Sequence, residues 1–158
     1  MSVQPLIEVL KKLVQLHKSL YQLSLEKTEA IKTGKIDVLN SLIKNEQKHI
    51  TAINMMEKQR ITIITKFFPD QKEPTLAECM QQMEPTDRDL LTSIQKDLVE
   101  TIEELKAVNA LNQELLEQSL QYVRLNLDLL MPDELPNYKG KPEEEALLPQ
   151  FSFFDSKA

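Results

Sequence analysis

Residues able to do chemistry are scarce in this chain, which has two histidines and one cysteine. Glu46 and His49 stand three residues apart, and on a helix this Glu-x-x-His spacing is the one used by carboxylate di-iron bundles. A di-iron site needs a second copy of the motif, but Val14 stands three residues before His17. The pair is therefore interpreted as an exposed polar turn of a helix, and no metal or other cofactor is expected.

His17 and Cys79 are also interpreted as structural residues. His17 falls on the apolar seam of its predicted helix, which is typical of a buried or half-buried histidine. Neither histidine is followed by the Lys and Gly spacing of phosphotransfer domains. Cys79 has no His or Cys near it, so an inert thiol in a reducing compartment is expected. Without a Gly-rich phosphate loop or a G-x-S-x-G motif, the chain is predicted to have no catalytic residues and not to be an enzyme.

The composition is typical of an acidic helical protein. Of the 158 residues, 41% are hydrophobic, 28% are charged and 5% are aromatic, with two glycines, which argues against a β-rich core. The net charge of −6 disfavours nucleic-acid binding. The first apolar segment contains charged residues, which a signal peptide would not have at these positions. The sequence contains no run of about 18 uncharged apolar residues, so no membrane-spanning helix is expected. A cytoplasmic, all-α protein is expected.

Two helices of similar length are predicted first. Residues 3–31 carry apolar side chains at steps of three and four, and residues from 36 or 37 to 67 repeat the pattern. Gly34 lies between them, in the place of a glycine that ends a helix in the left-handed conformation. Because the turn is short, the two helices are expected to form an antiparallel hairpin.

A connector with three prolines follows, at residues 69–85. Within it, Thr75 and Glu78 match a capping box and predict a short helix over 76–82. One long helix is then predicted over 87–131. The fold class is therefore all-α: an antiparallel helical hairpin plus one long C-terminal helix, packed as a three-helix coiled-coil-like bundle with a short connector helix.

The ends of the long helix have their own signals. Glu84 or Thr86 is expected to cap its start, and Pro132 is expected to stop it. Beyond it the composition changes to prolines and acidic residues, which predicts a flexible, proline-containing tail at 132–158, separate from a helical domain at 1–131.

Three aromatic residues near the end of that tail are costly to leave in water. They are Phe151, Phe153 and Phe154. Two interpretations stay open at this point: a sticky, disordered end, or a segment that docks on another surface.

The predicted lengths do not match, and this mismatch leads to a functional hypothesis. Each hairpin helix is about 45 Å long and the long helix about 67 Å, so about 20 Å at its end has no partner in the chain. An apolar stripe continues along that end, formed by Leu116, Leu120, Val123, Leu127 and Leu130. Such a stripe favours association with another amphipathic helix. The alternatives are that the helix bends back, or that the protein dimerises through this end.

Polar residues interrupt the apolar seams at three places. Asn109 and Asn112 do so on the long helix, just before the apolar end, and Glu46 does so on the second helix. Polar groups in a helical seam usually fix register or partner choice. The alternative is that these side chains point to solvent.

The chain resembles the FlgN family of flagellar type III export chaperones. The resemblance covers most of the first 131 residues and depends on two segments on either side of the proline-containing connector. These segments are LIEVLKKLVQLHKSLYQLSLEKTEAIKTGKIDVLNSLIKNEQKHI and ELKAVNALNQELLEQSLQYVRLNLDLL. The part most similar to the family is an asparagine-containing segment followed by a leucine-rich end of the helix. This segment is NALNQELLEQSL.

The resemblance implies a chaperone that binds the C-terminal amphipathic helices of the hook-associated (hook–filament junction) proteins. It would prevent their premature association and deliver them to the cytosolic domain of the export-gate membrane protein, with no small-molecule substrate. Carried onto this sequence, the stripe from Leu116 to Leu130 would bind cargo, with Asn109 and Asn112 setting the register. Tyr122 and Leu125 lie off the stripe and would contact the export gate. The alternative is a homodimeric coiled-coil scaffold or regulatory protein.

Overall fold

Four α-helices account for nearly all of residues 2–130, the part of the chain that the computed structural model describes. They are α1 (Gln4–Thr33), α2 (Ile36–Phe67), α3 (Leu76–Gln81) and α4 (Pro85–Leu130). No strand occurs within these residues. The predicted all-α class is confirmed. The expected tail at 132–158, with its three phenylalanines, lies outside the described residues.

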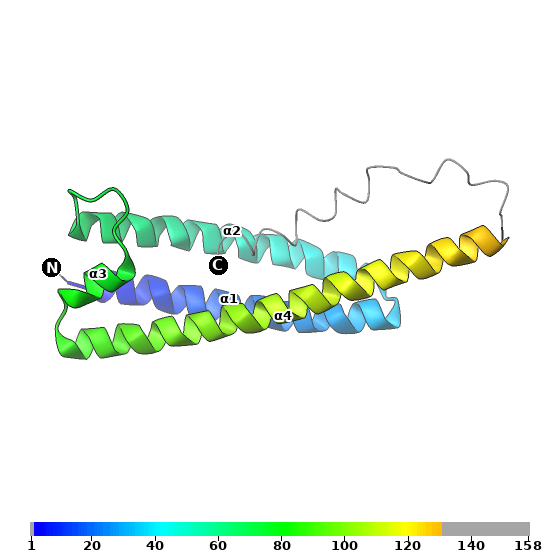
Figure 1. Ribbon diagram of the computed structural model, residues 1–158, viewed down its shortest axis with the longest axis horizontal. Coiled ribbons are helices and arrows are strands. Elements are labelled where there is room, and N and C mark those ends of the chain that lie inside the picture. The colour runs from blue at the N-terminus through cyan, green and yellow to red at the C-terminus, as the bar shows by residue number, and fades with distance from the viewer. Residues whose placement is uncertain (1, 131–158) are drawn as a thin grey trace.

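The first helix is the centre of the bundle. α1 lies between α2 and α4 and packs along both, with α2 antiparallel and α4 parallel to it (Figure 1). The short helix α3 covers the end at which α2 finishes and α4 begins (Figure 1). The hairpin with a long third helix is therefore present, arranged as two helices on either side of a central one.

The turn at Gly34 has the conformation that its sequence predicts. Gly34 has φ 67°, in the left-handed region where a side chain would be strained. Its N–H donates to the carbonyl of Ile31, and the N–H of Lys35 donates to the carbonyl of Ala30. This pair of bonds is a Schellman cap, which ends α1 and lets the chain reverse within two residues.

The connector and the start of α4 also follow local rules. Glu78 N–H donates to Thr75 Oγ1 at 3.2 Å and Thr75 N–H donates to Glu78 Oε2 at 3.1 Å, so the capping box is formed. α4 begins at Pro85, whose missing N–H does no harm in a first turn. Of the two expected caps, Glu84 therefore precedes the helix, and its carbonyl accepts from Arg88 N–H at 2.9 Å. Thr86 lies inside the helix.

The core is built mainly from α1, because this helix has neighbours on two sides. Its buried apolar side chains meet a few from each of the other helices. The most enclosed are Leu6, Leu13, Leu20, Leu91 and Leu105. His17 belongs to the same core, as expected, and its Nδ1 donates to the carbonyl of Leu13 at 2.7 Å.

Burial of His17 makes the fold sensitive to acid. Desolvation lowers the pKa of His17, opposed by its hydrogen bond to Leu13 and by the charge of Glu57. Since the unfolded chain binds the proton more readily, the stability from neutral His17 is complete above about pH 6.5 and is lost as pH falls towards the folded-state pKa. We expect the free energy of unfolding to fall as the pH drops below about 6.5, and to fall less in a His17→Leu variant. Urea denaturation followed by circular dichroism measures both, and equal declines would contradict this prediction.

Candidate functional site

The most distinctive surface of the molecule is the free end of α4. α4 has 46 residues and is about 69 Å long, whereas α1 has 30 residues and is about 45 Å long. Both helices start near the same end of the bundle, so α4 continues well past the Gly34 turn as one unbroken helix (Figure 1). We call residues 116–130 the overhang. Within the described residues, α4 does not bend back onto the hairpin.

The apolar side chains of the overhang are largely exposed. Val123 is 52% exposed and Leu130 is 79% exposed, while Leu116, nearest to the bundle, is half-buried. Leu120 and Leu127 are exposed as well. Single exposed apolar residues are ordinary on a protein surface, but a contiguous row of them is typical of an interaction site.

This row continues the face of α4 that packs on α1. The buried residues of α4 follow one another at steps of three, four or seven, which keep to one helix face, and the overhang residues continue that face at steps of three and four. The buried part consists of Leu91, Ile94, Thr101, Leu105, Asn109 and Asn112. The part beyond them, which we call the stripe, consists of half-buried Leu116 and the exposed residues Leu120, Val123, Leu127 and Leu130. A helix that covered the stripe would therefore lie in line with α1, beyond the Gly34 turn.

A second apolar row lies on another side of the same helix. Tyr122 is 68% exposed, and Leu111 and Leu129 lie eleven residues before and seven residues after it. Since α-helical positions seven residues apart share a face, Leu115, Tyr122 and Leu129 line up, with Leu111 one turn earlier. Leu125 is exposed beside this row. The sequence pattern already places Leu115, Leu125 and Leu129 off the stripe, and it favours Tyr122 and Leu125 as the contact with a second partner. Leu111 is an addition from the structure, although its spacing of four residues from Leu115 is a signal for it.

The two asparagines are placed differently from the stripe, because both are buried against α1. Ser24 Oγ donates to Asn109 Oδ1 at 3.1 Å, and Asn112 Nδ2 donates to the carbonyl of Ser24 at 2.9 Å. The hydroxyl of Thr28 also lies within hydrogen-bond distance of Asn112 Oδ1. Asn112 is fully buried and Asn109 is 8% exposed. The partners of these asparagines in the structure are thus residues of α1, so they do not belong to the exposed surface.

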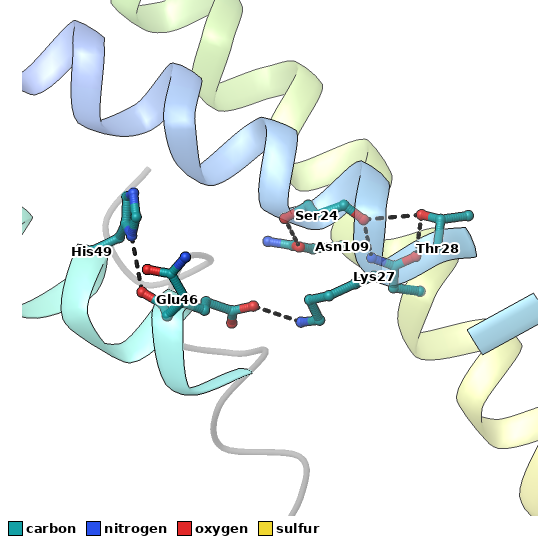
Figure 2. A network of polar contacts seen from close by, with 8 residues as sticks. Ser24, Lys27, Thr28, Glu46, His49 and Asn109 are labelled. Atoms are coloured by element: carbon teal, nitrogen blue, oxygen red, sulfur yellow. Dashed lines mark hydrogen bonds and ion pairs between the residues drawn. The ribbon is translucent and has the colours of Figure 1, made fainter. Parts of the chain in front are cut away.

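Glu46 and His49 have separate partners and do not form a shared site. Glu46 Oε2 accepts from Lys27 Nζ at 2.7 Å in a buried ion pair (Figure 2). His49 Nδ1 donates to the carbonyl of Asn45, and its Nε2 lies 2.8 Å from Ser19 Oγ. The interpretation as an exposed polar turn is therefore wrong for Glu46, because this residue faces the α1–α2 interface.

A metal site and a reactive cysteine find no support among the described residues. Residues 2–130 contain no group of three or more His, Cys, Asp or Glu side chains able to hold a metal ion. Cys79 is buried, and its burial raises the pKa of the thiol, which disfavours the reactive thiolate. None of the described helices is long and apolar enough to cross a membrane.

Comparison with known proteins identifies the family of the chain. The family model described as FlgN protein matches residues 1–144. The uncharacterized protein YvyG of Bacillus subtilis (strain 168) is 35% identical over 161 residues, covering 100% of both chains. No solved structure matches the chain significantly. FlgN proteins are chaperones that bind flagellar proteins, and the family is not enzymatic. The chain therefore belongs to the FlgN family of flagellar export chaperones.

Proposed function

We propose that this chain binds the C-terminal amphipathic helices of the hook-associated (hook–filament junction) proteins on the stripe of its overhang. While bound, the cargo helix would be kept from premature association in the cytoplasm. The observation that carries the proposal is the exposure of the stripe on a helix that outreaches its two neighbours.

The geometry of the stripe favours a helical cargo. Its apolar residues recur at steps of three and four, which matches the apolar face of another amphipathic helix. The overhang is 15 residues long, about 22 Å, so it has room for at most about four turns of a partner helix. Such a helix would abut the Gly34 turn and extend the α1–α4 contact with the same kind of packing.

Binding would act by mass action. Apolar surface on both partners leaves water on contact, and burial contributes about 25 cal/mol per Å² before the costs of association. Cargo held in this way is removed from competing self-association until another partner engages the complex.

The second row offers a site for that partner. Tyr122 and Leu125 lie off the stripe, so they would stay accessible while cargo occupies it. A tyrosine combines apolar contact area with a hydroxyl and is often an interface anchor. We propose these two residues as the contact with the cytosolic domain of the export-gate membrane protein, with Leu129 as a neighbour in the same row.

The alternative function, a homodimeric scaffold or regulator, depends on the same exposed stripe. Two copies could cover each other's overhang, since a long apolar stripe is compatible with self-pairing. Light scattering of the free protein over a dilution series separates the two possibilities. A dimer that survives dilution and excludes cargo supports the scaffold.

Hydrogen exchange with and without cargo tests the main proposal. The full chain is mixed with a synthetic peptide that covers the C-terminal helix of a hook-associated protein. We expect slower amide exchange within residues 116–130, because a packed partner reduces fraying of an exposed helix end, with little change in α2. Protection confined to the hairpin, or no binding, would contradict the assignment of the cargo site.

A further inference from the structure

A layer of polar side chains crosses all three long helices where the overhang begins. Ser24, Lys27 and Thr28 of α1 point towards partners on α2 and α4 (Figure 2). We call the whole group the polar layer. It consists of Ser24, Lys27, Thr28, Glu46, Asn109 and Asn112, all of them buried. No buried side-chain nitrogen or oxygen among the described residues lacks a hydrogen-bond partner, so the layer is fully satisfied.

The polar layer lies between two parts of α4 that both carry apolar side chains on the helix face directed towards α1. Before it, Leu91, Ile94, half-buried Leu98 and Leu105 pack in the core at steps of three, four and seven. After it, the stripe presents leucines and a valine at steps of three and four. Apolar packing is non-directional, so it discriminates poorly between these two parts. A shift of α4 by seven residues towards the base of the bundle would keep the same helix face on α1. It would move Leu116, Leu120 and Val123 to the present places of Asn109, Gln113 and Leu116, and so cover part of the stripe.

We infer that the polar layer fixes the register of α4 on α1 and so keeps the overhang, with its stripe, outside the bundle. Asn109 and Asn112 would act as positioning residues. The hydrogen bonds supply the direction-dependent contact that the leucines lack. They join atoms on specific residues, Ser24 to Asn109 and Ser24 to Asn112, at 3.1 and 2.9 Å.

A seven-residue shift would break these bonds in a buried place. Asn112 would then lie opposite Tyr21 instead of Thr28, and Ser24 would lie opposite Leu116 instead of Asn109. Buried polar groups that lose their partners destabilise a structure far more than a changed apolar contact does. A buried asparagine has this effect on register in coiled coils generally.

The base of α4 is tied to α3, so a shift of α4 must carry α3 with it. The Arg88 side chain donates to the carbonyls of Met80, Gln81 and Met83, which ties α4 to α3. α3 is joined to α2 by residues 68–75, which form no helix. α3 and α4 could move together only by pulling Cys79 and Met83 out of the core, and the polar layer is a second, direction-dependent contact that opposes this movement.

Spin-label distances test the inference without any cargo. Cysteines replace exposed Glu8 on α1 and exposed Gln121 on the overhang, in a Cys79→Ala background. The parent protein should show a single distance between the two spin labels. Asn109→Leu combined with Asn112→Leu keeps the seam apolar and should add a population about 10 Å shorter, which is seven residues of helix rise.

A matched control removes polar groups from the same layer at the other interface. Lys27→Met combined with Glu46→Leu affects α1 and α2, whose register the short Gly34 turn already fixes, so the single parent distance is expected. A single unchanged distance in the doubly substituted asparagine variant would overturn the inference. So would an equal shift in the control.

Cargo binding is a separate readout that depends on the proposed function. If the stripe binds cargo, the shifted population should bind the peptide of a hook-associated protein more weakly, in proportion to the fraction with a buried stripe. Shifted distances with unchanged peptide affinity would leave the register role standing and overturn the proposed cargo site. Unshifted distances would overturn the register role alone.

Discussion

Replacing Val123 and Leu127 together with aspartate should abolish capture of hook-associated proteins and leave the fold intact. Val123 is 52% exposed and Leu127 is 42% exposed, so neither contributes much to the chaperone's own core. In a complex, each aspartate would place a charge in an apolar contact without a partner, which is strongly unfavourable. Interface centres of this kind contribute several kcal/mol, so we expect affinity to fall by about 100-fold or more.

The measurement is a pull-down with the full-length cargo, followed by titration calorimetry with its C-terminal peptide. Far-ultraviolet circular dichroism and urea denaturation of each variant check that the helices are retained. Gln118→Asp combined with Gln121→Asp is the matched control, because it adds the same two charges to exposed positions of the overhang that lie off the stripe. Equal capture by the stripe variant and the control would place the cargo site elsewhere.

Much of the fold could be predicted because local signals mark each helix end. The helix-end signals do not depend on distant contacts. They are Gly34, the prolines and the Thr75–Glu78 capping box. The overhang follows from them by arithmetic, since the rise of an α-helix per residue is constant. The exposed stripe was therefore predictable as soon as the helix ends were placed.

The partners of the polar residues could not be predicted in the same way. Asn109 and Ser24 are 85 positions apart, and only the offset of α4 along α1 brings them together. The sequence pattern places Asn109 and Asn112 on the apolar face of α4. It does not predict which residue of α4 lies beside the C-terminal end of α1. A difference of two turns decides whether an asparagine bonds to α1 or faces an outside partner.

Lys27 was missed although the sequence contained a signal. It stands four residues after Leu23, so it continues a buried seam of α1 at a helical step. Glu46 was recognised as a polar residue in the seam of α2, yet a lysine 19 positions earlier is no evident partner until the hairpin closes. A charged residue on each of two facing seams is the combination that predicts a buried ion pair.

Removing one member of that pair should have the largest effect on stability of any single substitution in the polar layer. Lys27 Nζ lies 2.7 Å from Glu46 Oε2, and the two side chains are only 2% and 9% exposed. Glu46→Leu would leave a buried ammonium group without its carboxylate, and losses of about 3–5 kcal/mol are typical of such changes. This is a large fraction of the stability of an ordinary domain.

Two comparisons separate the charge effect from simple loss of contacts. Lys27→Met combined with Glu46→Leu should recover most of the stability lost in Glu46→Leu, because no buried charge then remains in the pair. Lys18→Met removes an ion pair with a similar 3.0 Å distance to Asp97, but those side chains are 55% and 47% exposed, so we expect a loss below about 1 kcal/mol. Urea denaturation of the four proteins supplies the values. If the double variant is as unstable as Glu46→Leu, the prediction is wrong. The loss in the single variant would then come from the missing attraction between Lys27 and Glu46, and not from the lysine charge that remains buried.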